Sequence, residues 1–302
     1  EIGRAVATPS YPKETEVPTS LPSFHRMQKC NDMFEAQRQN LILKELKMVS
    51  RPEDLKRDGS PQNLAFNWMI ESGMEANYCP PFGSNLTQRY IMALIYYHLG
   101  GYKWKKEREF ASTAHECSWE GVECNELKKV VSISLDENEL SGSIPDEIGF
   151  LHDLKALDLD LNSITGSLPS TLGLLRHLES LDVDSNFLTG EIPSGLYNNT
   201  SLRVIDLDNN TMSGTLSPSI GDLVNLKFLQ LHNNNFSGTI PNVFKKLVNL
   251  EYTYFHLNNF KGRMPSSLCR LRRVSLIENW ADCSGRQDSV KCASPSCCTL
   301  CR

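Results

Sequence analysis

Apolar and polar residues alternate through residues 128–271 with a period of 24 residues that occurs six times without a slip. An asparagine marks each period, with apolar residues five and three places before it and a glycine four places after it. The sixth period is weaker, with Thr253 and Phe255 in the apolar places. Such fixed periodicity predicts a repeat protein whose units stack on one another. The marker residues are Asn138, Asn162, Asn186, Asn210, Asn234 and Asn258.

Each period predicts one coil of a solenoid. The apolar-polar-apolar segment before the asparagine is typical of a short strand with one buried face, and parallel stacking joins such strands into one sheet. The asparagine amide both donates and accepts hydrogen bonds, so a ladder of asparagines can satisfy backbone groups inside the turn. Glycine permits the tight backbone after the strand, and proline, present seven places after the marker in five periods, favours an extended return. The predicted fold class is therefore α/β, a right-handed solenoid with short parallel strands.

The residues before the repeats predict a helical cap. Apolar residues recur at helical spacing over 33–49, Ser60-Pro61 is typical of a helix start, and another helix is expected over 84–99. The first residues are rich in Pro, Ser, Thr and Glu, which predicts a disordered leader. The expected division is a leader (1–23), a helical N-terminal cap (24–127), six repeats (128–271) and a cysteine-rich C-terminal cap (272–302).

The ten cysteines form even groups, and none lies between Cys124 and Cys269. This distribution is typical of disulfides that close the ends of a domain in an oxidising compartment. A zinc or redox role for the last cysteines is the less favoured alternative, and the pairing of the final six stays open. The groups are Cys30 and Cys79; Cys117 and Cys124; and Cys269, Cys283, Cys292, Cys297, Cys298 and Cys301.

N-glycosylation sequons also point to a secreted or surface protein, although such tripeptides arise by chance in an asparagine-rich repeat. A glycan on Asn209 would lie one place from Asp208 and could shield part of the surface described below. The acceptor residues are Asn85, Asn198, Asn199, Asn209 and Asn235.

The repeat L-x-x-L-x-L-x-x-N-x-L-x-G-x-I-P-x-x-[LI]-G-x-L, seen whole in 154–175, resembles the plant-type leucine-rich repeat of receptor-like proteins and receptor kinases. Directly before the repeats, residues 117–124 resemble that family's N-terminal cap motif, Cys-x-Trp-x-Gly-Val-x-Cys. The resemblance implies a disulfide between Cys117 and Cys124, and a Trp119 that closes the first coil. The helical residues before the motif resemble an extended cap of similar algal proteins, and the cysteine-rich tail resembles their C-terminal cap.

In such a solenoid the side chains two and four places before each asparagine point outward from the strands and form the concave surface. Seven of these twelve side chains are aspartates, and none is Lys or Arg. Because adjacent strands lie about 4.8 Å apart, neighbouring carboxylates repel one another. We name these aspartates the acidic columns: Asp136, Asp158, Asp160, Asp182, Asp184, Asp206 and Asp208.

Three interpretations of the acidic columns compete. A basic peptide or protein segment could lie along them, attracted by their charge. Calcium could bind between paired carboxylates, with waters completing its shell. The third interpretation is that aspartate only keeps an exposed sheet soluble. We expect a protein or peptide ligand, and no resident metal or cofactor.

The concave surface changes character in the last two repeats, where aromatic, amide and imidazole side chains replace aspartate. Such a patch suits a protein contact or a sugar ring. Zinc binding by the histidines beside Asp208 is disfavoured, because an open sheet offers no closed four-ligand site, and titration of the histidine pair is a further hypothesis. The residues of this aromatic patch are Phe228, Gln230, His232, Tyr252, Tyr254 and His256.

Charge and motifs disfavour several function classes. The net charge of -5 argues against a nucleic-acid partner, which would need a positive stripe. The apolar stretch from Tyr90 to Leu99 is too short to cross a bilayer, so no span is expected in this chain, although one outside it stays open. The chain has no phosphate-binding glycine loop, no His-Glu-x-x-His and no Gly-x-Ser-x-Gly, and an enzyme is not expected.

The sequence therefore predicts a non-catalytic binding module, extracellular or at the cell surface, that recognises a protein or peptide ligand on its concave face. A glycan is an alternative ligand. The role implied by the resemblance is the ectodomain of a receptor-like or adhesive protein. One alternative is a secreted inhibitor of extracellular hydrolases, since such inhibitors resemble the same repeat. Another is a cytosolic scaffold, which would require free thiols.

Overall fold

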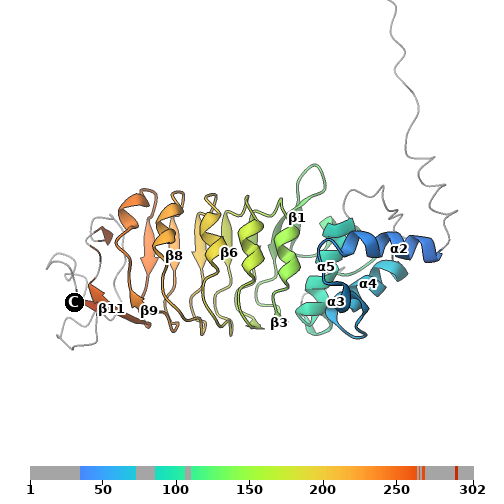
Figure 1. Ribbon diagram of the computed structural model, residues 1–302, viewed down its shortest axis with the longest axis horizontal. Helices are drawn as coiled ribbons and strands as arrows, with labels where there is room; N and C mark the ends of the chain where they lie inside the picture. The colour runs from blue at the N-terminus through green and yellow to red at the C-terminus, as the bar shows by residue number, and fades with distance from the viewer. Residues whose placement is uncertain are drawn as a thin grey trace, which may run out of the picture.

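The computed structural model describes residues 35–72, 86–105, 110–263, 265, 267–268 and 290–291. Within this part of the chain, coils stack along one axis and helices lie at its N-terminal end (Figure 1). The predicted solenoid with a helical N-terminal cap is confirmed. The predictions for the leader, for Asn85 and for eight cysteines fall outside the described residues. Those cysteines are Cys30, Cys79, Cys269, Cys283, Cys292, Cys297, Cys298 and Cys301.

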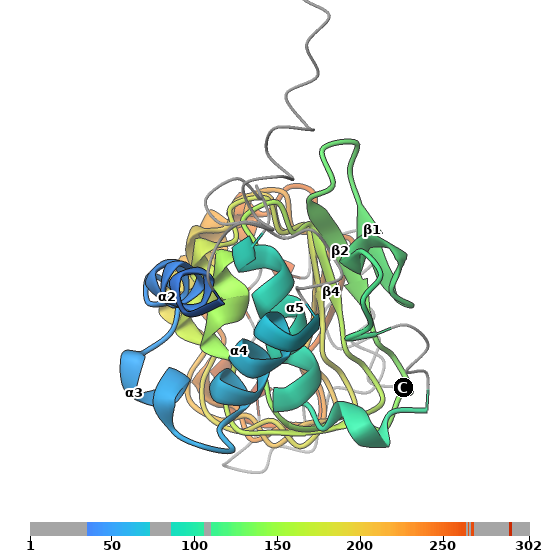
Figure 2. The ribbon, with the colours of Figure 1, turned by 90° about the vertical axis from the view of Figure 1, so that its right-hand side faces the viewer.

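Four helices build the described part of the cap, and Figure 2 shows them covering the end of the solenoid. Three match predicted helices, and the fourth, α3, is a five-residue helix that the periodicity did not reveal. Ser60 acts as the predicted cap of α4, because its hydroxyl oxygen accepts a hydrogen bond from the Asn63 amide at 3.1 Å. None of the described helices is long and apolar enough to cross a bilayer. The helices are α2 (Glu35–Leu46), α3 (Pro52–Lys56), α4 (Pro61–Ser72) and α5 (Leu86–His98).

The main sheet has seven strands in the order β1-β2-β4-β6-β7-β8-β10. The first strand is antiparallel to β2, and every other pair is parallel, as stacked coils require. Each coil after the first adds three strand residues to this sheet. The strands are β1 (Val122–Cys124), β2 (Val130–Ser134), β4 (Ala156–Asp158), β6 (Ser180–Asp182), β7 (Val204–Asp206), β8 (Phe228–Gln230) and β10 (Tyr252–Tyr254).

Shorter strands and 3-10 helices complete each coil. Strands β3 and β5 pair in parallel, and β9 pairs with β11, which also pairs with β12. These strands are β3 (Ser141–Ser143), β5 (Ser163–Thr165), β9 (Ser237–Thr239), β11 (Asn259–Arg263) and β12 (Val290–Lys291). The 3-10 helices of the coils are η3 (Asp146–Phe150), η4 (Ser170–Leu174), η5 (Ser194–Asn198), η6 (Pro218–Asp222) and η7 (Phe244–Lys246), and those of the cap are η1 (Gly101–Lys103) and η2 (Glu116–Ser118).

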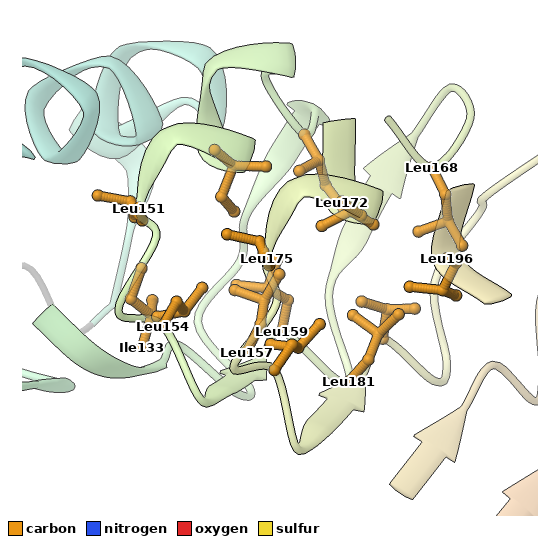
Figure 3. Close-up of a cluster of buried hydrophobic side chains, with 14 of the residues drawn as sticks. Ile133, Leu151, Leu154, Leu157, Leu159, Leu168, Leu172, Leu175, Leu181 and Leu196 are labelled. Atoms are coloured by element: carbon orange, nitrogen blue, oxygen red, sulfur yellow. The ribbon is translucent and has the colours of Figure 1, made fainter. Parts of the chain in front are cut away.

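The apolar core lies between the main sheet and the 3-10 helices, where leucines of successive coils pack against one another (Figure 3). The predicted asparagine ladder is present inside it. The Asn162 side-chain oxygen accepts hydrogen bonds from the Asn138 and Leu140 amides, both at 3.0 Å, and its nitrogen donates to the Leu135 carbonyl at 2.9 Å. Equivalent contacts recur in later coils. Each coil therefore satisfies backbone groups of the coil before it.

The cap joins the first coil through a disulfide and a buried ion pair. Cys117 and Cys124 are bonded, with their Cα atoms 5.5 Å apart, which confirms the pairing implied by the resemblance. Trp119, which lies between the two cysteines in the sequence, is buried. Its ring meets the Trp68 ring edge-on, with the ring centroids 5.9 Å apart. Arg89 of α5 donates to the Glu116 carboxylate at 3.1 Å, and both side chains are fully buried.

Candidate functional site: the outward face of the main sheet

Strand register brings the first predicted column together. Asp158 lies opposite Asp182, which lies opposite Asp206. The column continues through Gln230 to Tyr254. Positions four places before each asparagine are therefore neighbours in space, as the 24-residue period predicts.

The second column consists of the side chains two places before each asparagine. Backbone hydrogen bonds between successive coils, formed just after the strands, align it. The Leu161 amide donates to the Asp184 carbonyl at 3.2 Å, the Ser185 amide to the Asp208 carbonyl at 3.0 Å, and the Asn209 amide to the His232 carbonyl at 3.1 Å. Side chains two places before each asparagine therefore also form one row. The two columns together make a continuous outward face, whose role in ligand binding stays a prediction.

Two of the aspartates are buried, contrary to the expectation of an exposed sheet. Asp206 is 6% exposed and Asp208 is 4% exposed. The larger side chains of the next coil cover them: the Gln230 amide donates to Asp206, and His232 Nε2 lies 2.9 Å from an Asp208 oxygen. The Asn209 amide reaches the same Asp208 oxygen at 2.5 Å. A carboxylate in such a place contributes little to solubility, so that interpretation fails for this pair.

Burial and like charge change the ionisation of the acidic columns. Burial, followed by repulsion from neighbouring aspartates, raises the pKa of Asp160 to about 6. The same causes raise the pKa of Asp182 to about 7, and burial also raises the pKa of Asp184. The face is therefore less negative near neutral pH than the count of aspartates suggests.

The pKa values of the buried neighbours Asp206 and Asp208 are shifted in opposite directions. Burial raises the pKa of Asp206, and the neighbouring Asp208 carboxylate raises it further. Burial opposes ionisation of Asp208 as well, but hydrogen bonds from His232 and Asp206 lower its pKa. Burial and the neighbouring carboxylate therefore favour the neutral form of Asp206, and the contact with His232 favours the ionised form of Asp208.

Metal binding gains little support from this geometry. Asp184, Asp206 and Asp208 offer oxygens within 4.8 Å of one another, the sole such group among the described residues. Asp206 and Asp208 already accept hydrogen bonds from Gln230 and His232, which a cation would have to displace. Calcium also needs six to eight oxygen ligands, which is roughly twice the number that three carboxylates provide when each contributes one oxygen.

The predicted aromatic patch is assembled on the last two described coils of the sheet. Phe228 and Tyr252 stack with their ring centroids 5.4 Å apart and planes 7° apart. His232 and His256 stack at 4.4 Å, and Tyr254 meets both imidazoles edge-on at 5.8 and 6.1 Å. Flat rings are thereby fixed in rows beside the acidic columns, which suits contact with a planar or apolar group.

The sequons divide by exposure. Asn198, Asn209 and Asn235 are exposed, and glycosylation there stays a prediction. The prediction for Asn199 is wrong, because its side chain is fully buried and its amide nitrogen donates to the Leu172 carbonyl at 2.9 Å. A glycan on that nitrogen would have to break the coil.

Sequence reasoning missed two apolar side chains at the edge of this face. Leu161 is 49% exposed and Phe187 is 58% exposed. Leu161 comes directly before a marker asparagine and Phe187 directly after one, so both lie outside the two columns that were considered. The available signal was a large apolar residue at positions that are polar in most other coils.

Comparison with known proteins supports the fold and the plant-type character of the repeats. Two leucine-rich-repeat family models match residues 176–236 and 153–175. A probable leucine-rich-repeat receptor-like serine/threonine-protein kinase of Arabidopsis thaliana is 46% identical over 41 residues, which are 14% of this chain and 5% of that protein. These coils are leucine-rich repeats of the plant type.

Solved structures extend the likeness to more than half of this chain. A plant ice-binding protein is 28% identical with a TM-score of 0.58, covering 64% of this chain and 63% of its own. The Arabidopsis receptor kinase HAESA, in complex with the peptide hormone IDA and the co-receptor SERK1, is 30% identical with a TM-score of 0.53, covering 58% of this chain and 30% of its own. The chain thus spans less than two thirds of each of these proteins. It is a leucine-rich-repeat solenoid similar to plant receptor ectodomains.

Proposed function

We propose that this chain is the ligand-binding part of an extracellular, receptor-like protein, and that it takes a basic peptide along the acidic columns. The likeness to a receptor kinase that binds a peptide hormone supports a peptide ligand. The disulfide between Cys117 and Cys124 supports an oxidising, extracellular location over the cytosolic scaffold. Recognition, and not catalysis, is the role assigned to the face.

The crowding of partly buried aspartates in successive coils carries this proposal, since Asp158 lies opposite Asp182 and repulsion between neighbouring carboxylates helps to raise the pKa values of Asp160 and Asp182. Placing carboxylates beside like charges costs free energy, and no Lys or Arg occupies these columns. Residues that oppose stability in this way are expected where function requires them. A cationic side chain of a ligand would supply the missing opposite charge.

Selection from a phage-displayed library of random linear peptides on the full, disulfide-bonded chain tests the proposal. Enriched peptides should carry Lys or Arg, and salt should weaken their binding. The triple variant Asp158→Asn, Asp182→Asn, Asp206→Asn should lose at least about tenfold in affinity, about 1.4 kcal/mol. The matched control is Asp153→Asn, an exposed aspartate outside the face. Equal binding to the triple variant, or no enrichment, contradicts the proposal.

A second candidate function is ice binding, favoured by the parallel strand pair and bridges that follow the marker asparagines outside the main sheet. Hydroxyl side chains lie beside one another there in successive coils: Ser143 with Thr165, Ser167 with Thr189, and Thr215 with Ser237. Regularly spaced hydroxyls can order water, and one structural relative is a plant ice-binding protein. The pure chain should then keep ice crystals small during annealing, and Thr189→Lys with Thr215→Lys should abolish this. Crystal growth equal to that in buffer excludes the candidate.

A further inference from the structure

Six equivalent positions, each directly before a marker asparagine, share a left-handed backbone. Their φ angles lie between 46° and 53°. Asparagine tolerates this conformation better than other residues with a side chain, whereas leucine gains nothing from it. Two of the six positions nevertheless hold leucine. The six residues are Glu137, Leu161, Ser185, Asn209, Asn233 and Leu257.

Leu161 therefore lowers the stability of the fold in two ways, through its left-handed backbone conformation and through its exposed apolar side chain. Its φ is 52°, and 49% of the residue is exposed to water. The adjacent coil has Ser185 at the equivalent position, with φ at 49° and a polar side chain. Because the same chain shows that a small polar residue fits here, folding does not explain the leucine.

Phe187 is also exposed and lies in the next coil, two residues after Ser185, which is the equivalent of Leu161. The Leu161 and Asn162 amides donate to the Asp184 and Ser185 carbonyls, both at 3.2 Å, so this turn lies against the segment that leads to Phe187. Phe187 is 58% exposed, and the equivalent position of the next coil is Thr211. We name Leu161 and Phe187 the apolar rim.

The apolar rim borders the acidic columns. Asp160 directly precedes Leu161, and Asp184 shares the backbone contact with it. A partner that covers the rim therefore also comes within reach of carboxylates. Apolar surface flanked by negative charge is complementary to a segment with a large apolar side chain next to a basic one.

We propose that the apolar rim anchors the ligand, so that the peptide carries a large aliphatic or aromatic residue close to its basic residue. This inference rests on the proposed function and adds a second recognition element to it. The rim supplies apolar burial, which charge alone does not. The acidic columns supply the preference for cationic residues, and the rim restricts which basic peptides bind well.

Peptides selected from the random library on the wild-type chain test the inference. They should carry a large apolar residue near Lys or Arg. The double variant Leu161→Ser, Phe187→Thr places the residues of the neighbouring coils at both positions, so its unfolding midpoint in urea should equal or exceed that of the wild type. Its affinity for the selected peptides should fall at least about tenfold, because burial of two large side chains is lost.

Leu257→Ser is the matched control, since it makes the same change at the same backbone position of the last coil, far from Phe187 along the solenoid. It should leave the affinity unchanged. If peptides bind the double variant as tightly as the wild type but lose binding to the aspartate triple variant, the rim is not an anchor and the proposed function stands. If no peptides are enriched, both fail.

Discussion

Two of the places where the described residues bury ionisable side chains are satisfied in opposite ways. At the junction of cap and solenoid, the Glu116 carboxylate accepts hydrogen bonds from Arg89 at 3.1 Å and from Gln88 at 2.8 Å. On the outward face, the carboxyl groups of Asp206 and Asp208 share their surroundings with further aspartates. The first arrangement pairs opposite charges, and the second crowds acidic groups together.

The difference separates charges that stabilise the fold from charges that we assign to ligand binding. The Arg89 guanidinium also donates to the Ala114, Ser112 and Thr113 carbonyls, so its desolvation is offset by several partners. The acidic columns are instead surrounded by hydroxyl, amide and imidazole groups, from the side chains of Ser134, Gln230, Asn209 and His232. Removing charge should therefore weaken the junction and strengthen the face.

The largest effect is expected at the junction. Arg89→Met removes the arginine from the buried Glu116 carboxylate, which keeps its contacts with Gln88 and the partly exposed His115, and should lower the free energy of unfolding by about 3–5 kcal/mol. Equilibrium unfolding in urea measures this. The double variant Arg89→Met, Glu116→Gln should recover part of the loss, because no charge is then left unpaired. A loss below about 1 kcal/mol for the single variant would show that the pair is not structural.

The pH dependence of stability should reveal the crowded face. Because the folded-state pKa values of Asp160 and Asp182 are raised to about 6 and about 7, the folded chain binds protons more tightly than the unfolded chain. Their stabilising contribution is complete below the unfolded pKa near 3.9 and is lost as pH rises to about 7.

These two groups should together lower the free energy of unfolding by about 2–4 kcal/mol between pH 4 and pH 8, which opposes the usual behaviour of paired carboxylates. Urea unfolding of the wild type and of Asp160→Asn, Asp182→Asn across this range isolates the contribution. Identical pH profiles for the two proteins would remove the electrostatic account of the face.

Asp182→Asn alone should raise the free energy of unfolding by about 1–3 kcal/mol at pH 8 and change little at pH 4. The reason is that the amide carries no charge to desolvate or to repel Asp158 and Asp184. Asp153→Asn, at an exposed position outside the face, should stay within about 0.5 kcal/mol of the wild type. Destabilisation by Asp182→Asn at pH 8 would mean that its charge is satisfied.

The smallest effect extends the comparison to a neutral group. Thr253 occupies an apolar place of the sixth repeat, is fully buried, and its hydroxyl has no hydrogen-bond partner among the described residues. Thr253→Val keeps the shape and removes the unsatisfied hydroxyl, so it should stabilise by about 1 kcal/mol. The thermal midpoint gives the first measure, with Thr239→Val on the exposed edge as control. A lower midpoint for Thr253→Val would indicate a hydroxyl that is satisfied in solution.

The features that could be predicted from the sequence were those set by the repeat. The 24-residue period was enough for the solenoid, the asparagine ladder and the row in which Asp158, Asp182 and Asp206 lie, because a parallel stack makes equal positions neighbours. The cap was harder: α3 has five residues, too short for helical periodicity to show. Ser60 before Pro61 still marked the start of α4, since capping depends on local backbone groups.

The amino-acid sequence by itself determined which residues share a face, because the register of identical coils is written in its spacing. It could not determine how deeply each residue lies in that face. Asp206 and Asp208 are buried because Gln230 and His232 of the next coil fold over them, and Asn199 is buried because its amide reaches across to Leu172. Burial depends on the volume and direction of side chains from other coils, and these meet only in the assembled stack.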